Sequence, residues 1–413
     1  MIISACAQSQ SDVEPAIEVG PPPVSLTVLE FGGPNTLFAA EDVQNKVYAL
    51  ELAEIPDETG NLQSVPYNLV GFGSQLAAFF EVSPFDITYH DLAVHPVTKT
   101  AFVSLSMSGK DGDQSALVMV SPQGEIANLD YQTLTYTSVD IAEPADPSVT
   151  FWRDISAPTL SVTDFEYDGG QLYVAGLSNG EFASTLRTIS YPFDASVETT
   201  SIEMFHTAHN QNETRAPIRA MAMVDLDGAK TMVAAYTCTP LVTIPVDALD
   251  DGAHVVGNTV AELGYGNRPL EVLSLTAYNM ERQPEQFVLV INREMSANLI
   301  KLEDLAAAPA LTEPFAALGD TLGVDGTHIP FAGILQADDQ DAQFILTLRR
   351  NIDTGDVDLI SSMKGVYFRL SDFVSEYTFP AYTYAEHQAG TQMFHKMMKP
   401  HEGYPEQVIE SRP

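Results

Sequence analysis

Short runs in which apolar and polar residues alternate recur along most of the chain, separated by Gly, Pro, Asn and Asp. Alternation with a period of two residues is typical of β-strands, and these separating residues are typical of turns. The 3.6-residue period of amphipathic helices does not dominate the pattern. We therefore expect an all-β protein whose folded part extends from about Val24 to Phe379.

The strands recur in groups that begin about 50 to 75 residues apart, the spacing of propeller blades with inserted loops. A turn that carries Gly or Asp and a second strong strand follow each opening strand. We align the opening strands at Asn35–Ala40, His90–His95, Thr163–Tyr167, Ile218–Val224, Leu270–Thr276 and Ile329–Leu335. The early strand Val24–Phe31 is expected to complete the last group, beside Gly365–Leu370, and so to close a ring.

This pattern resembles the β-propeller superfamily, in which four-stranded antiparallel blades surround a central channel and leave no open sheet edge. The resemblance covers residues 24–379 and implies a single propeller of six or seven four-stranded blades. It rests on repeat architecture, because no blade carries a Trp-Asp signature or another family-specific motif. In such a fold the loops that lead into the inner strands converge at the channel mouth, where we expect the functional residues.

Two terminal segments flank the expected domain. Residues 1–23 end in three prolines and are expected to be a residual export signal followed by a flexible tether. Within them, Ser4-Ala5-Cys6 resembles the lipid-attachment site of bacterial lipoproteins. It predicts export to the periplasm or cell surface, with a lipid anchor at Cys6 as the membrane contact. Residues 380–413 are expected to be an irregular tail that contains His and Met.

The charge of the chain limits its partners. Among 413 residues, 56 are Asp or Glu and 19 are Lys or Arg, so the formal net charge is −37. Nucleic acid is excluded as a partner, because its phosphates need basic patches. An acidic surface is typical of proteins adapted to a salty exterior, and its field attracts cations and repels anionic substrates. A small-molecule substrate and a partner protein both remain open.

Histidines near the starts of predicted inner strands are candidate metal ligands. The candidates are His90, His209 and His328, with His206 as a further candidate beside His209. Imidazoles that converge from different strands are typical ligands of copper, zinc and iron. We predict a transition-metal site at the channel mouth, with copper or iron favoured and calcium as the alternative. The carboxylates predicted to orient the ligand rings are Asp91, Asp164 and Glu271.

Two other residues of metal-binding type have simpler interpretations. His95 precedes Pro96 in a predicted turn and is expected to be structural. Cys238 is a possible soft ligand for copper, but a buried free cysteine that behaves as a small hydrophobic residue is favoured.

Three classes of function remain open. The first is a metal-dependent oxidoreductase with an open coordination position for substrate or oxygen. The second is a calcium-dependent lactonase or esterase, similar to the gluconolactonase and paraoxonase propellers; this resemblance implies that Asp164, Glu271 and Asn210 surround the calcium ion. The third is a non-catalytic propeller that binds a protein or a glycan through its face. The chain has no Gly-x-Ser-x-Gly, P-loop, His-Glu-x-x-His or Rossmann motif.

Overall fold

The structure, a computed structural model, describes residues 21–53, 65–109, 112–151, 155–194, 196–237, 239–264, 268–279, 281, 283–293, 295–314, 321–329, 331 and 333–364. Several predictions lie outside these residues. They concern most of the tether with Cys6, the role of Cys238, the strand Gly365–Leu370 and the tail at 380–413.

Four sheets of four strands each make up most of the described chain. The first has the order β1 (Leu29–Gly33), β2 (Thr36–Glu41), β3 (Lys46–Glu51) and β9 (Tyr136–Asp140). The second has the order β5 (Ile87–Val94), β6 (Ala101–Gly109), β7 (Gly112–Val120) and β8 (Ile126–Leu129). The third has the order β21 (Pro269–Tyr278), β22 (Pro284–Asn292), β23 (Ala297–Lys301) and β25 (Thr327–Ile329). The fourth has the order β26 (Ile334–Asp339), β27 (Phe344–Arg350), β28 (Val357–Met363) and β4 (Asn68–Leu69).

A fifth, ten-stranded sheet contains two antiparallel runs. One run is β12 (Asp164–Asp168), β13 (Gln171–Leu177), β14 (Ser184–Ser190) and β15 (Glu198–His206). The other is β17 (Ile218–Leu226), β18 (Ala229–Tyr236), β19 (Pro240–Pro245) and β20 (His254–Glu262). Their outer strands, β15 and β20, pair in parallel, and the short strands β16 (Gln211–Glu213) and β24 (Leu322–Gly323) pair with β15 and β20.

The remaining elements among the described residues are short. Strands β10 (Thr150–Phe151) and β11 (Ile155–Ser156) form a hairpin. The helices are α1 (Phe72–Phe80), α2 (Leu302–Ala307), η2 (Pro84–Asp86), η3 (Tyr131–Thr133), η4 (Ala157–Leu160) and η5 (Val246–Ala248). None of the helices in the described part of the chain has the length and apolar character needed to cross a membrane. The prediction of an all-β protein is confirmed.

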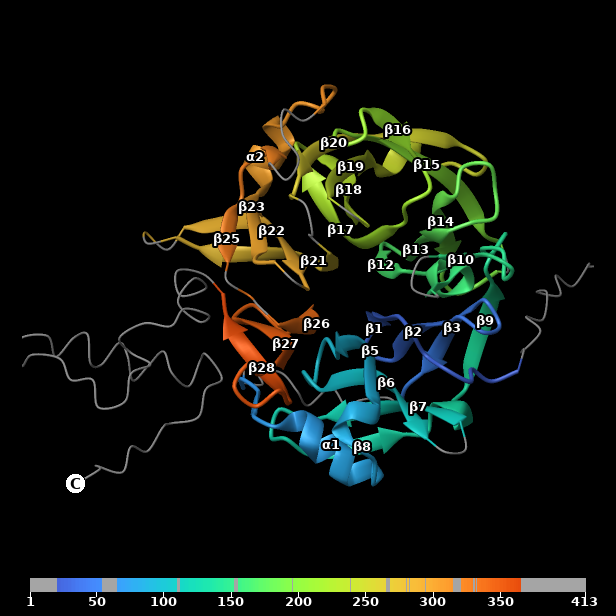
Figure 1. Cartoon of the computed structure of the whole chain (residues 1–413), viewed down its shortest axis with the longest axis vertical. Helices are drawn as coiled ribbons and strands as arrows, with labels where there is room; N and C mark the ends of the chain where they lie inside the picture. Colours follow the sequence, from blue (N-terminus) through green and yellow to red (C-terminus); the bar gives the residue numbers. More distant parts are fainter. Residues whose placement is uncertain are drawn as a thin grey trace, which may run out of the picture.

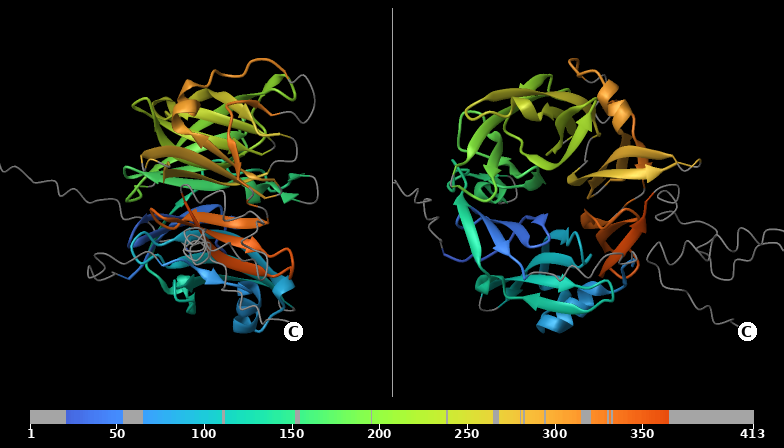
Figure 2. Two further views of the ribbon diagram at one scale, coloured as in Figure 1. Left: turned by 90° about the vertical axis from the view of Figure 1, so that its left-hand side faces the viewer. Right: turned by 180° about the vertical axis from the view of Figure 1, so that it is seen from behind.

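The sheets are arranged around a central axis as in a β-propeller (Figure 1). The strand nearest this axis is the first strand of each four-stranded sheet and of each run in the ten-stranded sheet. These inner strands are β1, β5, β12, β17, β21 and β26. Each inner strand contacts the next one around the ring, in the order β1, β12, β17, β21, β26, β5 and back to β1. The view from behind shows the same ring with α1 and α2 on its outer rim (Figure 2).

Hydrophobic packing between neighbouring sheets holds the ring together. In β2, Leu37 and Phe38 are adjacent and therefore point to opposite faces of the sheet. Phe38 belongs to the same hydrophobic cluster as Val174 of β13, whereas Leu37 belongs to the same cluster as Leu117 of β7. Because both faces of the sheet are covered, the middle strands are almost continuously apolar, and their burial removes large apolar areas from water.

The predicted closure of the ring is wrong in its strand assignment. Residues of the early segment form β1, which is the inner strand of the first sheet and pairs with β2. The outer strand of the fourth sheet is instead β4, which pairs with β28 at Leu69↔Leu359. The chain thus leaves the first sheet after β3, adds β4 to the fourth sheet, builds β5–β8, and returns as β9 to complete the first sheet.

Two of the predicted opening strands also need correction. Asn35–Ala40 overlaps β2, the second strand of its sheet. This almost fully buried strand has a stronger apolar pattern than β1, which faces the channel with Glu30. Ile329–Leu335 ends where β26 begins. The other four predicted opening strands overlap the observed inner strands β5, β12, β17 and β21.

Candidate functional site

Two histidines and a glutamate converge on the β15–β16 hairpin, at the outer edge of the ring. Strand β15 ends at His206, and the turn that follows carries His209. The turn is closed by a hydrogen bond from the His209 N–H to the His206 carbonyl at 3.1 Å, and Asn210 adopts a left-handed conformation with φ 52°. In the hairpin, Glu213 pairs with Met204, so its side chain lies on the same face as His206.

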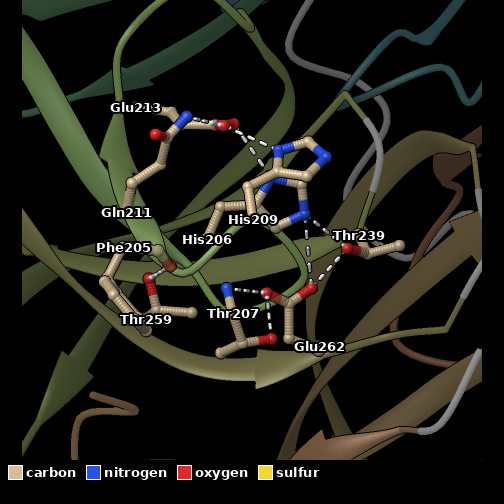
Figure 3. A network of polar contacts seen from close by, with 9 residues as sticks. All are labelled: Phe205, His206, Thr207, His209, Gln211, Glu213, Thr239, Thr259 and Glu262. Atoms are coloured by element: carbon tan, nitrogen blue, oxygen red, sulfur yellow. Dashed lines mark hydrogen bonds and ion pairs between the residues drawn. The ribbon is translucent and has the colours of Figure 1, made fainter. Parts of the chain in front are cut away.

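The polar atoms of these three side chains lie close together (Figure 3). His206 Nδ1 is 2.9 Å from Glu213 Oε2, and His209 Nδ1 is 2.6 Å from Glu213 Oε1. One potential ligand atom from each side chain lies within 4.8 Å of the other two. Among the described residues, this is the one group of three such side chains with that spacing.

A buried polar network fixes the far side of the His206 ring. His206 Nε2 lies 3.2 Å from Thr239 Oγ1, and the Thr239 hydroxyl donates to Glu262 (Figure 3). Glu262 also accepts hydrogen bonds from the Thr207 N–H and hydroxyl, both at 2.9 Å. Because the Thr239 proton points to Glu262, the Thr239 oxygen must accept from His206, and Nε2 therefore carries a proton.

This assignment leaves Nδ1 of His206 as the atom that faces Glu213. Without a cation, Nδ1 must also carry a proton in order to donate to the carboxylate, which would make His206 a buried imidazolium between Glu213 and Glu262. A metal ion on Nδ1 would replace that proton while Nε2 keeps its hydrogen bond. A histidine whose second nitrogen is held by a neighbouring acceptor is the usual arrangement of a metal ligand.

Exposure differs sharply among the three side chains. His206 is 2% exposed, Glu213 20% and His209 54%, so the group is anchored on one side and open to solvent on the other. Burial would raise the pKa of Glu213, but hydrogen bonds from Gln211 and the two histidines outweigh burial and hold that pKa below its ordinary value. The carboxylate is therefore ionised and ready to bind a cation at neutral pH.

The predicted trio of His90, His209 and His328 is not brought together. His90 lies in β5 and bonds to Ser106 Oγ at 2.9 Å, and burial lowers its pKa. His328 lies in β25, the outer strand of its sheet, and its Nδ1 is 3.1 Å from Ser296 Oγ. The prediction treated all three positions as starts of inner strands, but His209 and His328 belong to outer elements.

His95 has the structural role predicted for it. The ring is 1% exposed, its Nε2 is 2.8 Å from the Pro34 carbonyl, and its Nδ1 accepts from the Val97 and Thr98 N–H groups at 3.1 Å. Nδ1 thus closes the turn, and Nε2 connects the turn to Pro34.

Three predicted carboxylates lie elsewhere, in the central channel. Asp91, Asp164 and Glu271 line a cavity of about 180 Å³ between the inner strands, far in the fold from the hairpin histidines that they were predicted to orient. Three further carboxylates that sequence reasoning missed line the same cavity, namely Glu30, Glu166 and Asp338. The sequence did contain a sign of these residues, because Glu30 and Glu166 are charged residues on strands that were expected to be buried.

Three of these carboxylates connect neighbouring inner strands. Asp91 accepts from the Leu29 N–H at 2.7 Å, Asp164 from the Met221 N–H at 2.6 Å and Asp338 from the Val94 N–H at 2.6 Å. Each bond runs from one inner strand to the next in the same direction around the ring. It gives a partner to a backbone N–H on the inner edge of a sheet, where no further strand pairs.

Burial keeps the channel carboxylates partly protonated. It raises the pKa of Asp91 to about 7, and that of Glu166 and Asp338 to about 8, with smaller contributions from neighbouring acids at the last two. Burial also raises the pKa values of Glu30, Asp164 and Glu271 well above their ordinary range, and repulsion among the acids adds to the effect. The cavity can therefore reach a stable state by holding protons or by holding a cation.

Comparison with known proteins assigns no role to any residue of this chain. No family model matches the chain, and neither does any curated protein. Solved structures do match, at very low identity. The first two extracellular domains of Drosophila Semaphorin 1b are 8% identical, with a TM-score of 0.35 over 83% of this chain and 87% of that one.

Two bacterial enzymes give similar values. The PQQ-bound aldose sugar dehydrogenase of Streptomyces coelicolor is 10% identical, with a TM-score of 0.32 over 84% of this chain and 96% of that one. Virginiamycin B lyase of Staphylococcus aureus is 6% identical, with a TM-score of 0.28 over 82% of this chain and 95% of that one. At such identities and TM-scores, nothing about chemistry is transferred from these proteins.

Proposed function

We propose that this β-propeller is a metal-binding protein and that one transition-metal ion binds to His206, His209 and Glu213. The observation that carries the proposal is the convergence of two imidazole nitrogens and a carboxylate oxygen within 4.8 Å of one another. The hydrogen bond from His206 Nε2 to Thr239 supports it, because this bond directs Nδ1 toward the other two donors.

The donor set fits iron(II). Two imidazoles and one carboxylate with open positions are the ligands of non-haem iron oxygenases, whereas copper(I) prefers sulfur. Copper(II) is the alternative ion that we propose for the same site. The exposed side of His209 leaves room for a small-molecule substrate or oxygen beside the metal, which is the basis for proposing an oxidoreductase.

Calorimetric titration tests the proposal. The metal-free full chain is titrated with iron(II) under anaerobic conditions, and with copper(II), zinc and calcium in parallel. We expect one tight transition-metal site per chain. His209→Ala and Glu213→Gln should each weaken it by more than the 10- to 100-fold that is usual for partners outside the ligand set. His328→Ala is the matched control and should bind like the wild type. Equal affinity in all four proteins would overturn the proposal.

Calcium in the channel is the second candidate, and it corresponds to the hydrolase alternative. Asp164 and Glu271, two of the three residues implied for calcium, line one cavity together with four other carboxylates, and oxygen-rich sites suit calcium. The third, Asn210, lies in the hairpin turn instead. Calcium binding that is lost in Asp164→Asn and retained in His209→Ala would favour this candidate.

We also propose six blades, export and a lipid anchor. The count treats the ten-stranded sheet as two four-stranded blades joined by β15 and β20, which gives six inner strands around the axis. Export and an anchor at Cys6 are supported by Ser4-Ala5-Cys6 and by the acidic composition. Mass analysis of the mature protein from membranes of the native cell would test the anchor.

A further inference from the structure

A serine, a histidine and a glutamate share one face of the parallel pair formed by β15 and β20. Ser201 of β15 pairs with His254 of β20. Glu203 lies two residues beyond Ser201, so both side chains point to the same face of the strand. This arrangement is independent of the proposed metal site.

Hydrogen bonds connect Ser201 to His254 and His254 to Glu203. Ser201 Oγ is 2.9 Å from His254 Nδ1, and His254 Nε2 is 3.2 Å from Glu203 Oε2. Because an ionised carboxylate can only accept, Nε2 carries the ring proton and Nδ1 presents its lone pair to the Ser201 hydroxyl, whose other acceptor is the more distant Ala253 carbonyl at 3.3 Å. The ring nitrogens have exchanged the roles they have in serine proteases, but a general base needs only one protonated and one free nitrogen.

The surroundings give the group both support and access. The ring of Phe182 packs on the His254 imidazole with 4.0 Å between centroids and an angle of 37°. Ser201 lines a cavity of about 370 Å³ together with Phe182, Gly252 and Ala253. The side chains of His254 and Glu203 are 33% and 22% exposed, so a substrate can approach while the histidine is held in place.

We propose that Ser201 is a nucleophile that hydrolyses carboxylic esters, with His254 as its general base and Glu203 as a positioning residue. Ser201 Oγ forms a bond to the ester carbonyl carbon while its proton passes to His254 Nδ1. The carbon–oxygen bond to the leaving group breaks, and the leaving group takes that proton and departs as an alcohol. Water then attacks the acyl-serine, and a proton passes through Nδ1 back to Ser201 Oγ, which releases the carboxylic acid.

The charge around the cavity defines the class of ester. Glu143, Glu181 and Asp251 also line it, and no Lys or Arg is among its lining residues within the described chain. Such a field attracts cations and repels anions. We therefore infer that the substrates are neutral or cationic esters, and that an ester with a trimethylammonium group reacts faster than one with a carboxylate of equal intrinsic reactivity.

The test uses the purified full chain with 4-nitrophenyl acetate, in the presence and absence of a metal chelator. We expect turnover that the chelator does not change, and an acetyl group on the peptide that contains Ser201 when the reaction is quenched early. Ser201→Ala and His254→Ala should lose about 10²- to 10⁴-fold in rate, the usual contribution of nucleophile and base activation. Ser196→Ala, an exposed serine outside the cavity, should keep the wild-type rate.

Two measurements separate chemistry from a purely structural role. Added imidazole should raise the rate of His254→Ala more than that of Ser201→Ala, which measures hydrolysis of the ester by free imidazole; a structural defect would give no such difference. Glu203→Gln should lower kcat with little change in KM. Acetylation at residues other than Ser201, or a Ser201→Ala variant as fast as Ser196→Ala, would overturn the proposal.

Discussion

Asp338 in β26 accepts a hydrogen bond from the backbone N–H of Val94 in β5 at 2.6 Å, across the junction between two sheets whose first strands are more than two hundred residues apart in sequence. Similar bonds from Asp91 and Asp164 connect two other pairs of neighbouring inner strands in the same direction. The carboxylates of the channel are therefore part of the ring closure as well as the lining of a cavity.

Removing one of these bonds should destabilise the ring. Asp91→Ala leaves the Leu29 N–H and the Leu92 N–H without their carboxylate partner. We expect a loss of about 1 to 3 kcal/mol in the free energy of unfolding, the usual cost of an unsatisfied buried polar group. Denaturant unfolding measures this loss, and Asp353→Ala, at an exposed turn, is the control. Equal loss in both variants would contradict the role of Asp91.

Stability should fall as pH rises through the neutral range. The folded-state pKa values, about 7 for Asp91 and about 8 for Glu166 and Asp338, lie above the ordinary values, so the folded protein binds more protons than the unfolded chain. Their contribution is fully present below the unfolded pKa of about 4 and is lost as pH rises through 7 to 8. Thermal unfolding at fixed ionic strength should show Tm decreasing from pH 5 to 8.

A variant isolates this effect from the general repulsion of an acidic protein. In Asp338→Asn the group cannot ionise, so the decrease in Tm between pH 5 and 8 should be smaller than in the wild type. The same slope in both proteins would show that the channel carboxylates do not control the pH dependence.

The Thr239 hydroxyl should affect metal binding without touching the metal. Thr239→Val removes the acceptor for His206 Nε2 and leaves all three proposed ligands in place. We expect the metal affinity to fall about 10- to 100-fold, as is usual when such an orienting partner is lost. The control is Thr243→Val, a buried threonine of β19. If calorimetry gives the same affinity for both variants, the Thr239 contact does not orient the ring.

Tyr67 should be important for closing the ring. Its fully buried hydroxyl lies 2.6 Å from the Lys99 carbonyl and 2.8 Å from the Val120 carbonyl, and it accepts from the Ala101 N–H at 3.0 Å. Tyr67→Phe leaves these groups unpaired and should cost about 1 to 3 kcal/mol. Tyr278→Phe, at a half-exposed position, should cost little in the same denaturant experiment.

Periodicity was sufficient to predict the strands but not all of their partners. The predicted strand Thr163–Tyr167 overlaps β12, and Ile218–Val224 lies within β17, because local alternation reports burial directly. The pairing of β4 with β28 could not be predicted, since β4 has two residues and its partner is almost three hundred positions away. Such pairing depends on how the sheets meet around the ring.

The candidate site was only partly visible in the sequence for a related reason. His206 and His209 lie close together in the chain and were both predicted as ligands, but the role of Glu213 depends on the pairing of β16 with β15. Asp91, Asp164 and Glu271 do lie together as their positions on inner strands suggested. Their bonds to neighbouring strands depend on the curvature of the ring, which one strand's pattern does not encode.

The proposed metal site is tested most directly by anomalous diffraction. The data are recorded at the iron absorption edge from a crystal of the full chain loaded with iron(II). We predict one strong peak within bonding distance of Nδ1 of His206, Nδ1 of His209 and the carboxylate of Glu213. A loaded crystal with no peak at the hairpin, or with its peak among the carboxylates of the channel, would contradict it.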